Sequence, residues 1–274
     1  MSERGQSSAP RLELNGAPVS VDDLRHPLQT NYGHFTVMRA EDGCVRGLDL
    51  HLDRLQSATR ELFGSELDRD GVRGYLRHVL SGATGAWSVR VNVFARTLDR
   101  ERMDKTVDAD VLIAANPASI PATQPLRVKS FVYARETPRI KHVGTFGLFL
   151  HRRLARQAGC DDALFVDAGG RISEGSIWNV GLVDRDGTVV WPDAPQLDGV
   201  GMQLLKIGLA NLGTHLCVRP VFLGELARFR AAFFTNASAP VRALVAIDDC
   251  RFDVGVEITQ RLLAAYRSNP LQAI

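Results

Sequence analysis

The chain has 274 residues, of which 45% are hydrophobic and 23% charged. This length and composition allow one large or two modest hydrophobic cores and exclude the disordered, collagen-like and membrane-spanning classes. Lysine and arginine number 33 against 31 acidic residues, with no basic block, so we expect neither a nucleic-acid nor a membrane partner.

The cysteines and the N-terminus indicate the compartment. Four cysteines lie far apart without a C-x-x-C pair, a spacing that fits neither a zinc site nor a disulfide framework, so we expect no metal. The first residues, MSERGQSSAP, lack the apolar core of a signal peptide, and we expect residues 1–10 to be disordered. These features predict a cytoplasmic protein.

The first half of the chain alternates short strands and helices. RLELNGAPVS predicts a hairpin that turns at Asn15-Gly16, and HFTVMRA and CVRGLDL predict a second strand pair. HLDRLQSATRELFG is a predicted helix that ends at Gly64, and another lies around GVRGYLRHVLSG. The strands AWSVRVNVFAR and VLIAANPA complete a small N-terminal α/β domain over residues 1–120.

The Pro-rich segment SIPATQP marks a domain boundary, and residues 121–136 are a predicted linker. The next helix has apolar residues on one face at Phe146, Phe149, Leu150 and Leu154. A β-meander is predicted for ALFVDA, ISEGSIWNVGLV and TVVWP. It is followed by a predicted helix at GVGMQLLKIGLANLG, a strand at FRAAFFTNASAP and a closing helix at VGVEITQRLLAAYRS. Residues 137–274 thus form a larger, β-rich domain with helices, and the fold class is two-domain α+β.

Only four lysines could supply a reactive amine. Lys105 lies in a charged loop, Lys129 on an alternating strand and Lys206 within an apolar helix, and ordinary surface roles account for them. Lys141 stands where an extended segment meets an aromatic helix, with little acid nearby. Apolar surroundings favour a neutral amine, which a Schiff base or a proton shuttle requires, although this position alone does not establish either role.

Three further features are typical of a site for a charged cofactor. Glu174 shares strand parity with Ile172 and faces inward, where it needs a cation or strong donors; an edge or bulge at Gly175 is the alternative. The glycines of Asp198-Gly199-Val200-Gly201 open a helix with exposed N–H groups that can hold phosphate. Small residues after Thr235 and the guanidinium of Arg54 add further anion-binding groups.

A series of ordered motifs runs from about Leu14 to Asp248. In chain order they are LNG, HLDRL, a lysine before a helix, DALFVDAGGRISEGSIWNVGLV, GVGM and FFTNASAPV. The chain thereby resembles the class IV pyridoxal-phosphate aminotransferases of fold type IV, which include branched-chain and D-amino-acid aminotransferases and aminodeoxychorismate lyase. The resemblance implies a D-amino-acid aminotransferase-like fold, pyridoxal 5'-phosphate as cofactor and a homodimer. It also implies amino-group transfer between an amino acid or amine and a 2-keto acid through a Schiff base on Lys141.

The resemblance assigns further residues to the site. Glu174 is expected to bind the pyridine nitrogen and Arg54 the phosphate, with the remaining cofactor contacts from Asn179, Val200, Gly201, Asn236 and Ala237. Candidates for substrate binding are Phe35, Arg90, Arg96 and Trp178, with arginine suited to a carboxylate. Arg135 and Arg139 in the linker are the alternative arginines for that carboxylate.

Two departures keep other functions open. Gly201 and Met202 stand where the family usually has Thr and Arg, and Gly33-His34-Phe35-Thr36 lacks the acid and the tyrosine of the usual small-domain motif. Lys141-His142 and Thr235-Asn236 are closer to the lyase branch, so elimination of pyruvate from aminodeoxychorismate is one alternative. A non-catalytic relative that only binds the cofactor or a metabolite is another.

Overall fold

The computed structural model describes residues 9–274, so most of the segment expected to be disordered lies outside the described residues. The chain divides into two compact units. The first contains the chain up to Ile120, together with Ile140–Gly144 and Leu271–Ile274, and the second contains Pro121–Arg139 and Thr145–Pro270. The first unit therefore receives two short segments from beyond the predicted boundary.

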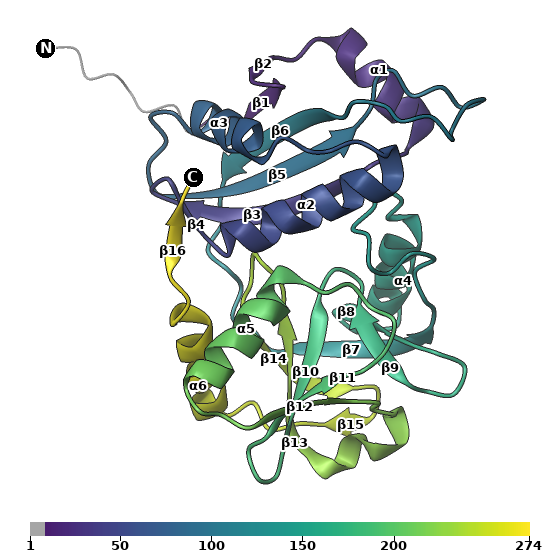
Figure 1. The fold of residues 1–274 in the computed structure, drawn as a ribbon. Coiled ribbons are helices and arrows are strands. Elements are labelled where there is room, and N and C mark those ends of the chain that lie inside the picture. Colours follow the sequence, from purple (N-terminus) through teal and green to yellow (C-terminus); the bar gives the residue numbers. More distant parts are fainter. Residues whose placement is uncertain (1–8) are drawn as a thin grey trace, which may run out of the picture. The chain divides into compact units, whose positions relative to one another are not determined.

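The first unit is built on an antiparallel sheet with the strand order β16-β4-β3-β5-β6-β1-β2 (Figure 1). Asn15 and Gly16 have positive φ angles of 50° and 78° and join the first two strands, which confirms the predicted hairpin. The strands are β1 (Arg11–Leu14), β2 (Ala17–Pro18), β3 (His34–Glu41), β4 (Cys44–Arg46), β5 (Ala86–Phe94), β6 (Asp110–Pro117) and β16 (Leu271–Ala273).

Helices α2 (Leu48–Phe63) and α3 (Arg69–Val79) cover one face of this sheet (Figure 1). Leu52, Leu55 and Leu76 pack against Met38 and Val91 in a single core. The alternation of buried and less buried residues along β5 places its odd-numbered valines in this core and Arg90 on the opposite face.

Two local predictions for this unit need correction. The segment CVRGLDL is a strand only through Arg46, because Gly47 adopts a left-handed conformation and α2 begins at Leu48. Helix α1 (Val21–Thr30) was not predicted, although Ser20 and Asp23 form a reciprocal capping box at its start.

The second unit contains a mixed sheet with the order β12-β11-β10-β13-β14-β7-β8-β9, and β9 also pairs with β10. This last pairing closes a ring of strands and brings β9, β10 and β13 side by side. The strands are β7 (Leu126–Val132), β8 (Asp162–Val166), β9 (Ile172–Gly175), β10 (Asn179–Asp184), β11 (Val189–Pro192), β12 (Leu216–Arg219), β13 (Phe229–Thr235), β14 (Arg242–Ile247) and β15 (Cys250–Arg251). The segment predicted as a linker therefore contains β7, a strand of this sheet.

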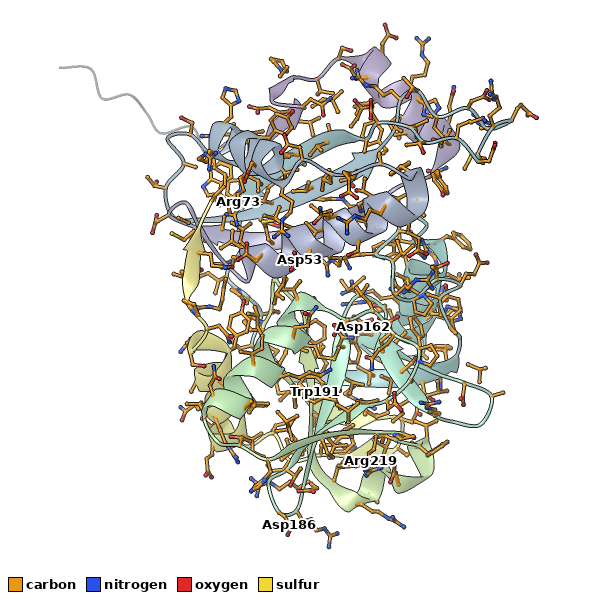
Figure 2. All side chains as sticks on the ribbon, viewed as in Figure 1. Asp53, Arg73, Asp162, Asp186, Trp191 and Arg219 are labelled. Carbon is orange, nitrogen blue, oxygen red and sulfur yellow. The ribbon has the colours of Figure 1, made fainter. Side chains whose placement is uncertain are left out.

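The helical segments of the second unit are α4 (Phe146–Gln157), α5 (Val200–Asn211), the 3₁₀ helix η1 (Leu223–Arg228) and α6 (Val256–Arg267). Helices α5 and α6 approach closely at Gly208, where a Cβ atom would lie 1.8 Å from the carbonyl oxygen of Ala265. Trp191, labelled in Figure 2, is fully buried beneath α5 with Leu205 and Leu209. This packing fixes the position of α5 on the sheet.

The apolar face of α4 lies on the surface. Phe146 and Phe149 are 79% and 52% exposed, and Leu150 and Leu154 are each 39% exposed. The helix instead buries Leu148 and Ala155 against Phe165. The four side chains share one face of a helix, as predicted, but this face does not contribute to the core of the unit. None of the helices in residues 9–274 has the length and apolarity needed to cross a bilayer.

Candidate functional site

The polar residues of the second unit form one row across three strands. Glu174 on β9 is the register partner of Asn179 on β10, and Asn179 is the register partner of Thr235 on β13. Directly opposed residues on neighbouring strands project from the same face of a sheet. The row therefore places a carboxylate, an amide and a hydroxyl side by side.

Glu174 is a buried carboxylate with a buried cationic partner. Its Oε1 atom accepts a 3.1 Å hydrogen bond from Nε of Arg135, and both residues are less than 10% exposed. Its Oε2 atom accepts from the backbone N–H of Leu197 at 3.2 Å, and Arg135 also donates to the carbonyl of Pro138. An ionised carboxylate only accepts hydrogen bonds and has about four lone-pair positions for them. This is the acceptor that a protonated ring nitrogen requires.

The loop before α5 crosses over this row. Asn179 holds it by donating from Nδ2 to the carbonyl oxygen of Leu197 at 2.8 Å. A Cβ atom on Gly199 would lie 2.1 Å from Oδ1 of Asn179, and one on Gly201 would lie 2.8 Å from Oγ1 of Thr235. Side chains at Gly199 and Gly201 would collide with the row, so the two glycines allow the backbone to approach it.

The start of α5 has the properties of an anion site. Gly199 is the N-cap, no side chain of the described residues caps the helix, and the first turn contains no acid. The first N–H groups of a helix have no intrahelical acceptor, and together with the helix dipole they favour a negative charge. Phosphate thus fits at Val200 and Gly201, close to the buried carboxylate that fits a pyridine N–H.

Asn236 and Ala237 lie in the turn that follows β13. Oδ1 of Asn236 accepts hydrogen bonds from the backbone N–H groups of Ser238 and Ala239 at 3.0 and 2.8 Å. A Cβ atom on Gly201 would also lie 2.8 Å from the carbonyl carbon of Asn236. The side chain of Asn236 therefore shapes the turn, and the backbone of the turn lies against the start of α5.

Lys141 belongs to the first unit, where its segment pairs antiparallel with the start of β3 through a bridge between His142 and His34. Its carbonyl oxygen accepts from the N–H of Phe35 at 2.9 Å, and Val143 donates to the carbonyl of Gly33 at 3.0 Å. The Nζ atom of Lys141 lies 4.9 Å from the centroid of the Phe35 ring. These contacts fix the backbone of Lys141 and hold its half-buried amine beside an aromatic surface.

Arg54 is tied into a buried hydrogen-bond network in the same unit. Its Nη2 atom donates to Oγ1 of Thr36, which lies 2.6 Å from Nδ1 of His51. Burial, followed by the charges of Arg54 and Lys141, holds the pKa of His51 well below its usual value. Burial, followed by the charge of Arg54, lowers the pKa of His34 to about 3. Both histidines are neutral at neutral pH.

Arg90 differs from the other arginines considered for substrate binding. Its guanidinium carbon lies 3.6 Å from the centroid of the Phe35 ring, and within residues 9–274 it has no ion pair with a carboxylate. Arg96 instead pairs with Asp23 and, at 2.9 Å, with Asp110. Trp178 is 3% exposed and stacks on Phe234 in the core, with ring centroids 5.1 Å apart.

Several site residues were not identified from the sequence. Thr36 and His51 have no distinctive motif, and only the His51-x-x-Arg54 spacing, which places both on one helical face, could have indicated a shared network. Arg135 is among the arginines predicted for a substrate carboxylate, but in the structure it pairs with Glu174. Asp162, labelled in Figure 2, is likewise buried and accepts a 2.5 Å hydrogen bond from Ser176, two residues after Glu174. This bond anchors the turn that follows β9.

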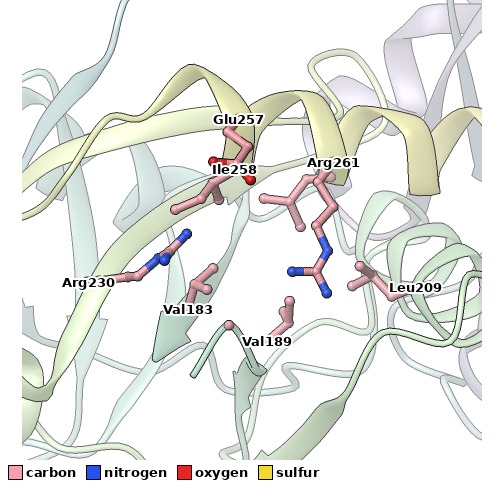
Figure 3. A pocket seen from close by; sticks show the side chains of 9 residues that line it. Val183, Val189, Leu209, Arg230, Glu257, Ile258 and Arg261 are labelled. Atoms are coloured by element: carbon pink, nitrogen blue, oxygen red, sulfur yellow. The ribbon is translucent and has the colours of Figure 1, made fainter. Parts of the chain in front are cut away.

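A separate cavity in the second unit is too small for a coenzyme. It has a volume of about 30 Å³, enough for about one water molecule, and Arg230 and Arg261 reach into it (Figure 3). Val183, Val189 and Leu209 form part of its apolar wall. This cavity therefore does not hold the coenzyme.

Comparisons with known proteins identify the family of this chain. The model of the amino-transferase class IV family matches residues 33–247. A branched-chain-amino-acid aminotransferase of Pseudomonas aeruginosa is 25% identical over 267 residues, which cover 89% of this chain and 85% of that protein. An aminodeoxychorismate lyase of Bacillus subtilis is also 25% identical, over 258 residues, with coverages of 88% and 85%.

Solved structures have the same fold. A branched-chain aminotransferase from Thermoproteus uzoniensis, crystallised with norvaline, superposes with a TM-score of 0.83 at 22% identity, and the match covers 93% of each chain. This likeness confirms the fold class predicted from the sequence.

Proposed function

This chain belongs to the amino-transferase class IV family and is a pyridoxal-phosphate-dependent aminotransferase, and we propose which residues perform its chemistry. Lys141 supplies the amine that joins the aldehyde carbon of the coenzyme. Glu174 accepts the ring N–H, while the start of α5 and Arg54 bind the phosphate. The observation that carries the proposal is the row in which buried Glu174 lies beside the open N-terminus of α5.

The surroundings of Glu174 favour its role as a fixed anion. Arg135 offsets the cost of burying the carboxylate, and the N–H of Leu197 orients its second oxygen. A negative charge beside the pyridine nitrogen keeps that nitrogen protonated. When bound, the protonated ring accepts the electron pair released as the α-proton of the substrate leaves.

Lys141 is the general base in this proposal. Once the amine of the substrate had displaced it from the coenzyme, its Nζ atom would take the α-proton of the amino acid and return it on the coenzyme side, so one residue would move the proton in both directions. The backbone bonds to Phe35 and Gly33 limit the motion of the segment, and the Phe35 ring excludes water from one side of the amine. Precise placement of a base raises the rate of proton transfer.

Arg90 is our candidate for recognising the carboxylate that an amino donor and a 2-keto acid share. The half-buried guanidinium is stacked on an aromatic ring, and its Nε atom donates to Oδ1 of Asn92 at 2.9 Å. It has no carboxylate partner among residues 9–274, so its two terminal nitrogens can form a bidentate ion pair. The Phe35 ring holds the plane of the guanidinium. The existing ion pairs of Arg96 and the buried position of Trp178 make both weaker candidates.

Elimination of pyruvate from aminodeoxychorismate is the second candidate function. The lyase relative is as similar to this chain as the aminotransferase relative, at 25% identity each. Both reactions need the same acid, the same lysine and the same coenzyme.

A spectroscopic assay separates the two reactions. The loaded protein is expected to absorb at roughly 400–430 nm, to lose this band when amino acids are added and to regain it with a 2-keto acid. Pyruvate release from aminodeoxychorismate, without bleaching by any D- or L-amino acid, indicates the lyase instead. A protein that binds the coenzyme and does neither contradicts both proposals.

We also propose a homodimer in the cytoplasm. The exposed face of α4, formed by Phe146, Phe149, Leu150 and Leu154, is an apolar stripe of the kind that pairs with a second copy. All four cysteines are free, as expected of a protein kept in a reducing compartment.

A further inference from the structure

Thr235 carries a buried hydroxyl that the protein does not satisfy. The residue is fully buried, and its Oγ1 atom has no hydrogen-bond partner within residues 9–274. Buried hydroxyls in proteins nearly always have a partner, because an unpaired one loses the hydrogen bonds that it made with water. Valine has the same shape and avoids this cost, so packing alone does not account for a threonine here.

The hydroxyl is aimed at the start of α5. Oγ1 of Thr235 lies 2.8 Å from the position that a Cβ atom on Gly201 would occupy. Gly201 is in the first turn of α5, where the N–H groups have no intrahelical acceptor and no side chain of the described residues caps the helix. Two kinds of unpaired donor, one from β13 and one from α5, therefore face the same point.

The charges around this point favour a ligand with acceptor atoms. Glu174 is the only carboxylate in the row, and Arg135 already compensates its charge. The positive end of the α5 dipole is not offset by an acid in the first turn. Gly199 and Gly201 have no side chain that could supply a donor. An anion oxygen at the start of α5 would thus satisfy both the helix amides and the hydroxyl.

We propose that Thr235 donates a hydrogen bond to a phosphate oxygen bound at the start of α5, supplying from β13 the hydroxyl that Gly201 cannot provide. This inference rests on the proposed function, since it takes the phosphate to be that of the coenzyme. It makes Thr235 a binding residue for the phosphate group and gives it no part in proton transfer.

The test compares Thr235→Val, which removes only the hydroxyl, with Thr235→Ser, which keeps it. Dissociation constants for pyridoxal 5'-phosphate and for pyridoxal, which lacks the phosphate, are measured by absorbance titration of the coenzyme-free protein. We expect Thr235→Val to weaken pyridoxal phosphate binding by about tenfold or more, as for a hydrogen bond to a charged group. Thr235→Ser is expected to stay within about threefold of the unchanged protein.

Thermal unfolding of the coenzyme-free protein gives a second readout. Removal of an unsatisfied hydroxyl is expected to raise the melting temperature of Thr235→Val by about 2 °C or more. Inorganic phosphate is expected to raise the melting temperature of the unchanged protein and of Thr235→Ser more than that of Thr235→Val. If Thr235→Val does not fold, Thr235→Ala serves as the hydroxyl-free variant in the binding titrations.

The outcomes separate this inference from the proposed function. If Thr235→Val binds pyridoxal phosphate like the unchanged protein, or loses pyridoxal and pyridoxal phosphate equally, Thr235 does not bind the phosphate. Either result leaves the roles of Lys141 and Glu174 intact. If the unchanged protein itself fails to bind pyridoxal phosphate, the proposed function is wrong and this inference falls with it.

Discussion

Removal of the guanidinium that neutralises Glu174 gives the strongest test of the buried row. In Arg135→Met, the carboxylate of Glu174 loses the 3.1 Å hydrogen bond from Nε of Arg135, and the carbonyl of Pro138 loses its bond from Nη2. The two side chains are 4% and 8% exposed, so solvent screens their attraction little. At 3.1 Å and an effective dielectric constant of about 20, that attraction is about 5 kcal/mol. Loss of one partner from a buried pair costs about 3–5 kcal/mol, a large share of the stability of a typical domain.

Urea denaturation of the coenzyme-free protein measures this cost. A double-mutant cycle with Glu174→Gln isolates the pair, because the double variant contains neither of its two charges. We expect Arg135→Met to lose about 3 kcal/mol or more, and the double variant to lose about 2 kcal/mol less than the sum of the two single variants. A single-variant loss below about 1 kcal/mol, or additive losses, would refute the claim that a buried ion pair sustains the row.

Three further predictions concern separate parts of the molecule. His34 has a pKa of about 3 in the folded protein and about 6.5 in the unfolded chain. Below pH 6.5 the unfolded chain takes up a proton that the folded protein does not bind, so the free energy of unfolding falls as the pH is lowered from 6.5 towards 3. Between pH 7 and pH 4, the unchanged protein should therefore lose about 3 kcal/mol more stability than His34→Gln; equal losses in urea titrations would show that His34 does not titrate as described. Arg90→Met should raise KM for carboxylate substrates about tenfold or more with a smaller change in kcat, whereas Arg96→Met should leave both constants unchanged. Similar effects of the two substitutions would contradict the assignment of Arg90 as the carboxylate-binding residue. Phe149→Glu should convert a dimer into monomers in sedimentation experiments, and a dimer that persists would exclude the α4 face as the contact.

Local features of the fold could be predicted because short segments determine them. Asn15-Gly16 reverses the chain with two positive φ angles, and Gly64 ends α2 in a left-handed conformation, as expected of these residue types. The helical spacing of Phe146, Phe149 and Leu154 was also read correctly. Periodicity indicates which side chains share a face, but it does not indicate what covers that face.

The candidate site depended on non-local facts. Glu174 was expected to face inward, yet its alignment with Asn179 and Thr235 arises from the pairing of three strands. The buried partner of Glu174 comes from Arg135, 39 residues away in sequence. No local pattern identifies such a pair, because strand register and the path of the intervening chain determine which residues meet.

The central claim is that the coenzyme is attached to one particular amine. Borohydride reduction of the loaded protein, followed by proteolysis and mass spectrometry, locates that attachment among the four lysines. We predict that the added mass lies on the peptide containing Lys141 and that Lys129→Ala, which changes an exposed lysine on β7, is labelled equally well. A label on Lys105, Lys129 or Lys206, or undiminished labelling of Lys141→Ala, would contradict the account.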